Sequence, residues 1–314
     1  MIRVLPRLLL VGLFALVFAG PVLAWNKAGH MLTGAIAYQQ LRAEGDEQTI
    51  GRVVALLKAH PEFSRWDKAM QKLAKEDRAQ YLFMQAARWP DDARDDPTFY
   101  PPDAHYDKHH YINLPYVPKG QPDSVKPKAP EDMNIFRGYA HRLELVKSKK
   151  DADIRAVALC WVFHLVGDVH QPLHATSLFT TQFKNGDRGG TLFMIRAKEG
   201  KFPISLHKYW DDLLLSSESF TNVKNYAIEL RNRKEFAREQ LTELKSTSFQ
   251  DWAVKESFEL AKTAVYREGK LEGGASMKQA KVLPEDYAKT VQPIAERRAV
   301  LAGYRLAAVL RDSL

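Results

Sequence analysis

The stretch from His164 to His174 places three imidazoles and one carboxylate in, or just beyond, a markedly apolar part of the chain. Between Ala156 and Val169, the only strongly polar side chains are those of His164 and Asp168. A helix that is apolar on all sides is normally buried, and a buried carboxylate is costly unless it is paired or bound to a metal. Residues four apart share a helical face, and imidazole with carboxylate suits zinc. The alternative for this pair alone is a core histidine hydrogen-bonded to a core aspartate.

A second pair with the same spacing, His207 and Asp211, also has apolar neighbours. Pro172 is expected to end the first helix, so that His174 turns back toward His164. Two such pairs and a third histidine favour a metal site over a chance pair on a solvated helix.

Two further motifs offer candidate residues. In Trp89-Pro90-Asp91, a carboxylate is expected just after a helix, with Arg94 three residues on, although aspartate after proline is also ordinary turn chemistry. In the His109-His110 pair, adjacent side chains of an extended segment point to opposite sides, so at most one should reach a given metal.

The first 24 residues have the features of a cleaved signal peptide: Arg3 and Arg7, an apolar run over 8–20, and small residues before a cut after Ala24. The run is too short for a permanent membrane span. Cleavage would give Trp25 a free amine, which could chelate a metal together with its own carbonyl oxygen. The alternative is a frayed terminus with an aromatic anchor.

Export to the periplasm or the medium is therefore expected, with no stable membrane association. Cys160 is the only cysteine and no Asn-x-Ser/Thr sequon occurs, which favours a bacterial exported protein. Loss of Arg3 and Arg7 lowers the formal net charge from +8 to about +6. This mild excess fits a polyanionic partner without requiring one.

Hydrophobic periodicity predicts an all-α fold: a single, mainly helical domain over 25–314 with long irregular loops and at most a small β-hairpin. No Gly/Ser linker or repeat divides the chain. Residues 75–88 should form a helix halted at Trp89-Pro90, and the Pro-rich segment 92–132 a long loop. Strands at 191–195 and 202–206 should pair, with Pro203 confining the second to an edge. The other expected helices are 28–41, 49–58, 131–146, 153–170, 219–233, 250–266 and 284–310.

Together these motifs resemble the zinc-dependent single-strand nucleases, namely the fungal S-one and P-one nucleases with their plant and bacterial relatives. That superfamily also contains bacterial zinc phospholipase C. The order and spacing of the motifs and the position of the signal cleavage all agree with the family pattern. The matching residues are Trp25, His30, Asp91, Arg94, His110, Tyr111, His164, Asp168, His174, His207 and Asp211.

The resemblance implies three zinc ions at the bottom of a cleft in an all-helical fold. One zinc would be held by Asp91, His110, His164 and Asp168. A second would be held by His174, His207 and Asp211. The third would be held by the Trp25 amine and carbonyl, His30 and Asp168, which bridges two zinc ions.

The implied enzyme is a hydrolase, a zinc-dependent endonuclease that cuts single-stranded DNA and RNA to 5′-phosphate products through zinc-activated water. It would also act on 3′-nucleotides as a 3′-nucleotidase. Arg94 would grip a nonbridging phosphate oxygen, and Asp168 would serve catalysis as the bridging carboxylate. Tyr111 would stack on an unpaired base, or else only pack the loop.

Two other functions compete with this one: a zinc-dependent phospholipase C with the same metals, and a zinc-binding protein without activity. Three residues depart from the family pattern, Asn113, Thr191 and Ser205, and the last two could loosen the support of His207. Five histidines stay outside the ligand set. His60 and His141 are interpreted as surface or helix residues, His105 and His109 as candidates for the cleft mouth, and His170 as a residue that supports the ligands.

Overall fold

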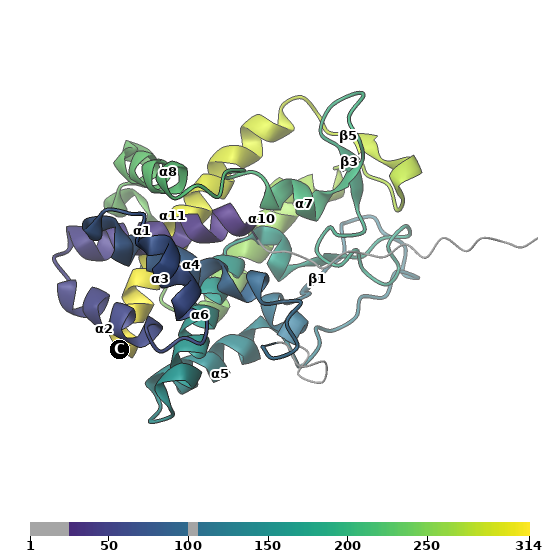
Figure 1. The fold of residues 1–314 in the computed structure, drawn as a ribbon. Coiled ribbons are helices and arrows are strands. Elements are labelled where there is room, and N and C mark those ends of the chain that lie inside the picture. The colour runs from purple at the N-terminus through teal and green to yellow at the C-terminus, as the bar shows by residue number, and fades with distance from the viewer. Residues whose placement is uncertain (1–24, 100–105) are drawn as a thin grey trace, which may run out of the picture.

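Helices build most of the chain in the computed structural model, which describes residues 25–99 and 106–314 (Figure 1). The all-α prediction is confirmed. The predicted signal peptide 1–24 and residues 100–105, which include His105, lie outside the described residues. The longer helices are α1 (Lys27–Ala43), α2 (Glu47–Leu57), α3 (Phe63–Met70), α4 (Arg78–Asp92), α5 (Ile135–Lys147), α6 (Ala152–Asp168), α8 (Phe220–Asn232) and α11 (Tyr287–Ser313).

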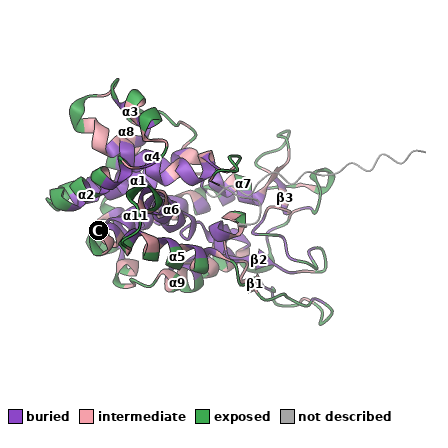
Figure 2. Cartoon of the chain, turned by 60° about the horizontal axis from the view of Figure 1, so that its bottom comes forward, coloured by how far each residue is buried: buried purple, intermediate pink, exposed green. Residues whose placement is uncertain are grey.

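The helices α1 and α6 run through the interior, and Figure 2 shows both of them largely buried. Helix α6 is buried on every side from Ala158 to Asp168, as its apolar sequence requires. Helix α1 packs against α4 and α11, while α6 packs against α4 and α5. Polar side chains on the buried parts of these two helices are therefore held away from water, among fixed neighbours.

Side-chain caps set the start of several helices. Asn26 accepts a hydrogen bond from Gly29 N at 2.9 Å and begins α1, and Asp46 does the same for α2 through Thr49 N at 3.0 Å. Asn134 caps α5 through Phe136 N, so this helix starts at Ile135 rather than at residue 131 as predicted.

The predicted stop at Trp89-Pro90 is wrong. Helix α4 passes through Pro90 and ends at Asp92, while Lys75–Asp77 forms a separate 3₁₀ turn before it. Because Pro90 lies in the last turn, its missing N–H removes one helical hydrogen bond and leaves few residues beyond it to disturb. Trp89 and Pro90 are both buried, and this packing favours the helical path. Asp91 consequently projects from a rigid helix and not from a loop.

Among the described residues, five strands of two or three residues form two small sheets. The predicted hairpin is confirmed as β3 (Met194–Arg196) antiparallel to β4 (Ile204–Ser205), with β4 at the sheet edge. The sequence did not indicate the other three strands. They are β5 (Lys281–Val282), parallel to β3, and the parallel pair of β1 (Pro115–Tyr116) and β2 (Ser177–Leu178).

One predicted helix departs from regular α-helical geometry. The predicted helix 250–266 starts with α9 (Phe249–Asp251), continues through π-helical turns over Trp252–Ser257 and Ala261–Val265, and contains α10 (Phe258–Leu260) between them. Helix α11 continues through Pro293. Within 25–99 and 106–314, none of the helices combines the length and apolar character that crossing a membrane would need.

His60 corrects an interpretation from the sequence, because it is a buried residue and not a surface one. Its ring stacks on Trp66 with centroids 4.5 Å apart, and its Nδ1 accepts a hydrogen bond from Glu62 N. Burial lowers the pKa of His60 to about 3. His60 is therefore a neutral core residue at physiological pH.

Candidate metal centre

Side chains from six separate elements converge at the buried end of α6. The elements are α1, α4, α6, the 3₁₀ turn η3 (Tyr106–His110), the 3₁₀ turn η4 (Pro172–Ala175) and α7 (Leu206–Asp211). We call this set the ligand cluster. It consists of His30, Asp91, His110, His164, Asp168, His174, His207 and Asp211, all of them buried.

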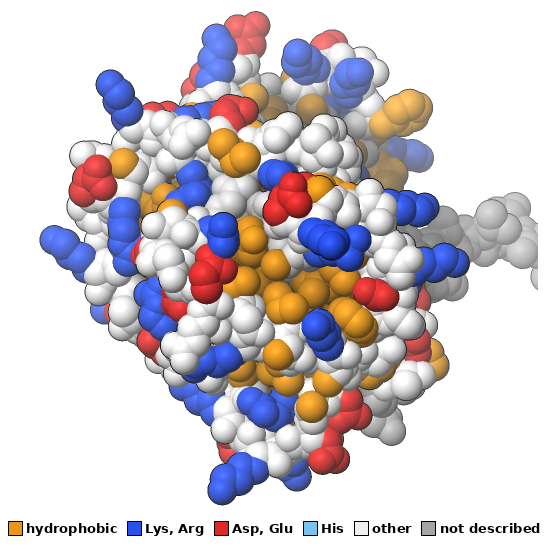
Figure 3. All heavy atoms as spheres, turned by 60° about the vertical axis from the view of Figure 1, so that its left-hand side comes forward, with side chains coloured by type: hydrophobic (Ala, Val, Ile, Leu, Met, Phe, Trp, Pro, Cys, Tyr) orange, Lys and Arg blue, Asp and Glu red, His pale blue; other side chains and the backbone are white. Residues whose placement is uncertain are grey.

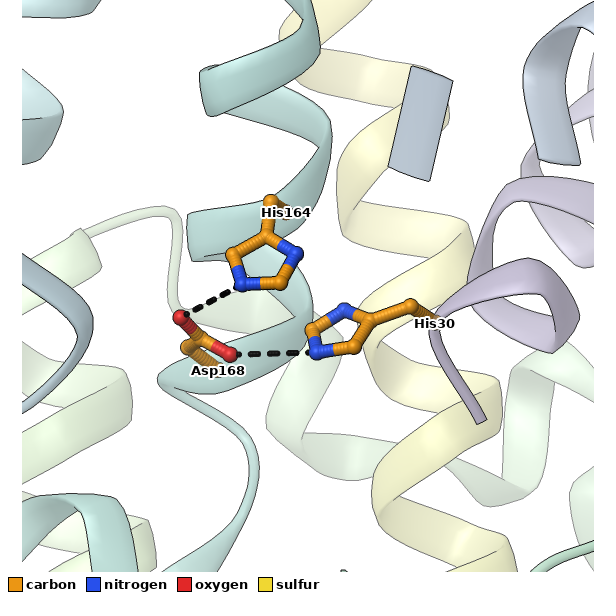
Figure 4. Close-up of side chains that lie close together, drawn as sticks. All are labelled: His30, His164 and Asp168. Atoms are coloured by element: carbon orange, nitrogen blue, oxygen red, sulfur yellow. Dashed lines mark ion pairs between the residues drawn. The ribbon is translucent and has the colours of Figure 1, made fainter. Parts of the chain in front are cut away.

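Asp168 lies at the centre of the first half of the cluster (Figure 4). Its Oδ2 is 3.3 Å from His164 Nε2 on the same helix, and its Oδ1 is 3.3 Å from His30 Nε2 on α1. The two imidazole rings stack with centroids 3.8 Å apart. One carboxylate thus contacts two histidines through different oxygens, as a bridging ligand would.

His110 and Asp91 close this half of the cluster from the other side. His110 Nδ1 lies 3.0 Å from both Asp168 Oδ2 and His164 Nε2. Asp91 Oδ1 is 3.7 Å from His164 Nε2 and accepts a hydrogen bond from Arg94 Nη2 at 2.6 Å. Arg94 also lies 3.4 Å from His110 Nε2, so its guanidinium borders the cluster.

His174, His207 and Asp211 form the second half. His174 Nδ1 is 2.7 Å from the His110 carbonyl, and His207 Nδ1 is 2.6 Å from the Gly189 carbonyl. Because a carbonyl only accepts, each Nδ1 carries the proton, and each neutral ring presents a lone pair at Nε2. The two Nε2 atoms face each other at 3.1 Å, with Asp211 Oδ2 3.6 Å from His207 Nε2. Lone pairs this close repel unless a cation or a proton lies between them.

The backbone around this second half explains its precision. Ser205 caps α7 by accepting a hydrogen bond from Lys208 N at 3.1 Å, so this departure from the family pattern still supports the helix that carries His207. Gly189 has a φ of +59°, and a Cβ there would lie 2.3 Å from the Leu173 carbonyl oxygen. Only glycine allows the close approach that aims the Gly189 carbonyl at His207.

Gln171, which was not among the predicted site residues, is fully buried. Its amide nitrogen donates to Asp211 Oδ1 at 2.8 Å, and its amide oxygen accepts from Leu173 N at 2.6 Å. One side chain therefore links the turn that carries His174 to the helix that carries Asp211. A glutamine three residues before His174 was the signal available in the sequence, but its partner lies 40 residues away.

The cluster fits a bound cation on two grounds. Both ring nitrogens of His30, Asp91 Oδ2 and Asp168 Oδ1 are buried without hydrogen bonds among the described residues. Burial raises the pKa of Asp168 and of Asp211 well above the ordinary range, and lowers the pKa of His30 and His110. A divalent cation would keep the carboxylates ionised and would use the neutral imidazoles as ligands.

Three sets of these side chains place one ligand atom each within 4.8 Å of the others. The sets are Asp91, His110 and His164; His30, His164 and Asp168; and His174, His207 and Asp211. All eight predicted side-chain ligands therefore come together, although the second set contains His164 where the resemblance implied the Trp25 main chain.

Trp25 lies next to the cluster. Its side chain is buried, its Nε1 donates to the Gly167 carbonyl at 3.1 Å, and Asn26 N donates to the Asp211 carbonyl at 3.2 Å. These contacts hold the start of α1 against α6 and α7. Cleavage after Ala24 falls outside the described residues, so the amine ligand stays a prediction.

Three of the other histidines have structural surroundings of their own. His109 is buried against Gly138 of α5, and burial lowers its pKa to about 4. His170 donates from Nδ1 to the Val166 carbonyl and contacts Arg305 through Nε2. His141 is exposed on α5, as expected.

Tyr111, Asn113 and Thr191 are the remaining residues that the sequence analysis singled out. Tyr111 follows His110 and is half-buried, with its carbonyl accepting from Ile135 N at 3.0 Å. Asn113 is also half-buried, and the Thr191 hydroxyl is buried without a hydrogen-bond partner among the described residues. The Thr191 hydroxyl therefore contributes no hydrogen bond to the support of His207 among the described residues.

Comparison with known proteins agrees with this geometry. The family model described as S1/P1 Nuclease matches residues 25–314. The chain is 25% identical over 187 residues to Endonuclease 4 of Arabidopsis thaliana, covering 55% of this chain and 57% of that protein. It is 28% identical over 164 residues to Endonuclease 5 of the same plant, covering 49% of each. The chain thus spans about half the length of the curated relatives it matches. Because the family model covers the whole described part, the chain belongs to the S1/P1 nuclease family.

Proposed function

We propose that this protein is a zinc-dependent phosphodiesterase that hydrolyses single-stranded DNA and RNA. The observation that carries the proposal is the buried convergence of three carboxylates and five imidazoles whose acceptor atoms face one another. Membership of the S1/P1 nuclease family supports the choice of nucleic acid as substrate. Products with 5′ phosphates, activity on 3′-nucleotides and export after cleavage at Ala24 are part of the same proposal.

The ligand cluster would hold three zinc ions, with the Trp25 amine and carbonyl completing the set around His30 and Asp168. Zinc supplies positive charge that makes water nucleophilic near neutral pH and that offsets charge on phosphoryl oxygens. His174 and His207 keep their protons on Nδ1, where the two carbonyls hold them, so that both Nε2 atoms stay available as ligands. Asp168 contacts His30 through Oδ1, and it contacts both His164 and His110 through Oδ2.

Arg94 would bind a nonbridging oxygen of the scissile phosphate. Asp91 orients its guanidinium through a 2.6 Å ion pair, and the Arg94 side chain is only 11% exposed. A planar guanidinium in such surroundings forms short, charge-assisted hydrogen bonds to phosphate. Tyr111, next to His110 and half-buried, would stack on an unpaired base, which favours single strands over duplexes.

Net charge contributes little to the choice of substrate. On the face drawn in Figure 3, Lys and Arg side chains are interspersed with Asp and Glu around a group of hydrophobic side chains. No continuous basic surface covers that face. The proposal therefore depends on the ligand cluster, on Arg94 and on the family, and phospholipase C activity remains the alternative that a substrate assay must test.

The decisive experiment compares protein beginning at Trp25 with protein carrying one additional alanine before it. Both proteins are loaded with zinc, and their metal content is measured. Their rates of hydrolysis are then measured on single-stranded DNA, duplex DNA and phosphatidylcholine vesicles. We expect single-stranded DNA to be cut fastest, and the extension to lower both zinc content and rate. Equal zinc and equal rate would remove the amine ligand from the proposal, and faster cleavage of phosphatidylcholine would replace the substrate class.

A further inference from the structure

Arg188 has an unusual backbone conformation for its residue type. Its φ is +53°, in the left-handed region that disfavours residues with a Cβ. In the part of the chain that the structure describes, Arg267 and Glu268 are the other non-glycine residues with positive φ, and Arg267 is paired with Asp286. The Arg188 side chain is exposed, and no carboxylate of the described residues pairs with it. A strained residue with a solvent-facing charge suggests a role in binding.

Asp187 anchors the buried side of the turn that carries Arg188, residues 186–190. This carboxylate is fully buried and accepts hydrogen bonds from the Tyr266 hydroxyl at 2.6 Å and from Leu178 N at 2.8 Å. Arg188 N itself donates to the Ser177 hydroxyl at 3.2 Å. The backbone of Arg188 is therefore anchored on both sides while its guanidinium faces outward.

The same turn borders the ligand cluster. The residue after Arg188, Gly189, provides the carbonyl that accepts from His207, and Gly190 packs against Leu173, the neighbour of His174. Ser177, whose hydroxyl accepts from Arg188 N, donates its own N–H at 2.9 Å to the carbonyl of Leu114, three residues after Tyr111. Arg188 thus lies in a turn that contacts the second half of the cluster and, through Ser177, the segment that follows Tyr111.

We propose that Arg188 binds a phosphate of the single strand next to the one that occupies the ligand cluster. This inference rests on the proposed function, because it assumes a polynucleotide substrate. A strand that crosses the cluster and contacts Tyr111 carries one negative charge at each linkage, and a guanidinium beside its path provides a forked donor for a second phosphate. Such a contact positions the strand without reading its bases.

The test uses three variants of zinc-loaded protein: Arg188→Ala, Arg188→Gly and Arg188→Lys. Binding is measured by fluorescence anisotropy over a range of salt concentrations, with a labelled oligothymidylate whose phosphorodithioate linkages resist hydrolysis. Loss of the guanidinium should weaken binding about tenfold and reduce the salt dependence by about one phosphate contact. The lysine variant should fall between, because it keeps the charge without the fork. KM for a 3′-mononucleotide, which has one phosphate, should not change.

Arg188→Gly separates a binding role from a conformational one. Glycine removes the backbone strain, so this variant should melt at a higher temperature than Arg188→Ala while it binds the oligonucleotide equally weakly. Arg52→Ala is the matched control, because Arg52 is exposed on α2, away from the cluster, and should bind as the unmodified protein does.

Two outcomes separate this inference from the proposed function. If the unmodified protein cuts DNA while the alanine and glycine variants bind the oligonucleotide as tightly, the inference is overturned and the function stands. If these variants bind weakly and none of the proteins hydrolyses DNA, the Arg188 contact stands and the proposed function fails.

Discussion

Two buried polar clusters flank the C-terminal end of α6, and they differ in how their charges are balanced. Asp168 faces the ligand cluster, whereas His170, two residues later, faces what we call the arginine cluster: His170, Glu256, Arg298 and Arg305. Arg305 binds Glu256 at 2.6 Å and contacts His170 Nε2 at 2.8 Å. Arg298 pairs with Glu256 and donates to the His170 carbonyl at 3.1 Å.

The arginine cluster contains its own cations, so each acceptor there faces a donor. In the ligand cluster, carboxylate oxygens and imidazole lone pairs face one another, with Arg94 as the bordering cation. Both clusters are buried and both contain histidine. The balance of donors and acceptors, and not burial, therefore separates a structural histidine from a candidate metal ligand.

The largest expected effect comes from removing the charge of Asp168. Asp168→Asn keeps the shape of the side chain but weakens both zinc sites that the carboxylate joins, and nuclease activity should fall by roughly a thousandfold or more. Zinc content, measured by mass spectrometry, should fall with it. In metal-free protein the same change should not lower the melting temperature, because it removes a buried carboxylate that lacks a cation. Full zinc content with full activity would contradict the assignment.

The matching change in the arginine cluster should lower the stability of the fold and leave zinc content and activity unchanged. Glu256→Gln leaves two buried guanidinium groups without their counter-charge, which should destabilise the fold by about 3 kcal/mol or more. This loss should be the same with and without a chelator, as measured by denaturant unfolding. Activity per folded molecule and zinc content should be unchanged. A loss of zinc in this variant would mean that the two clusters are coupled through α6.

This contrast also explains which features of the two clusters could be predicted from the sequence. The apolar run of α6 predicted a buried helix, and the regular spacing of His164 and Asp168 placed both on one face, because helix geometry alone determines it. The contact of His170 with Arg305 was not predictable, since the two residues lie 135 apart in the sequence. Pro172 begins a new turn between His170 and His174, but tertiary packing decides which cluster each histidine joins.

Boundaries set by tertiary packing were missed for the same reason. Pro90 predicted a helix end, but burial of Trp89 and Pro90 continues α4 to Asp92 and places Asp91 on a rigid element. The parallel pairing of β1 with β2 joins residues about 60 apart, over two residues per strand, and no sequence periodicity is visible in so short a segment. The predicted ligand side chains do lie together, and their role in binding zinc is what the variants test.

Asp187 provides an intermediate case, a buried carboxylate that has hydrogen-bond donors but no cation. Burial raises its pKa to about 6, while hydrogen bonds from Tyr266 and Leu178 oppose the shift. An acid whose folded-state pKa is raised stabilises the fold while it is protonated. Its contribution is therefore complete below about pH 4 and is lost as the pH rises through about 6, by up to about 3 kcal/mol.

The check is unfolding free energy against pH in the presence of a chelator. Asp187→Asn should remove this part of the pH dependence between pH 4 and 6. The exposed Asp123→Asn should keep it. If Asp187→Asn leaves the slope unchanged, the carboxylate is already ionised in this range, and hydrogen bonds alone are sufficient to hold a buried charge beside the ligand cluster.

The smallest effect concerns Gln171, whose donor satisfies one oxygen of Asp211 and leaves the other for a metal. Gln171→Ala should lower the affinity of one zinc equivalent by about 10- to 100-fold, measured by competition with a chelating dye, because Asp211 loses its fixed orientation. Gln39→Ala is the control, since it also removes a buried amide donor, from α1 to the Lys224 carbonyl. Both changes should lower stability, but only the first should release zinc. Equal zinc affinity in the two variants would show that His174, His207 and the helix α7 orient Asp211 without help, and the ligand cluster would then need no hydrogen-bonded support of the kind that defines the arginine cluster.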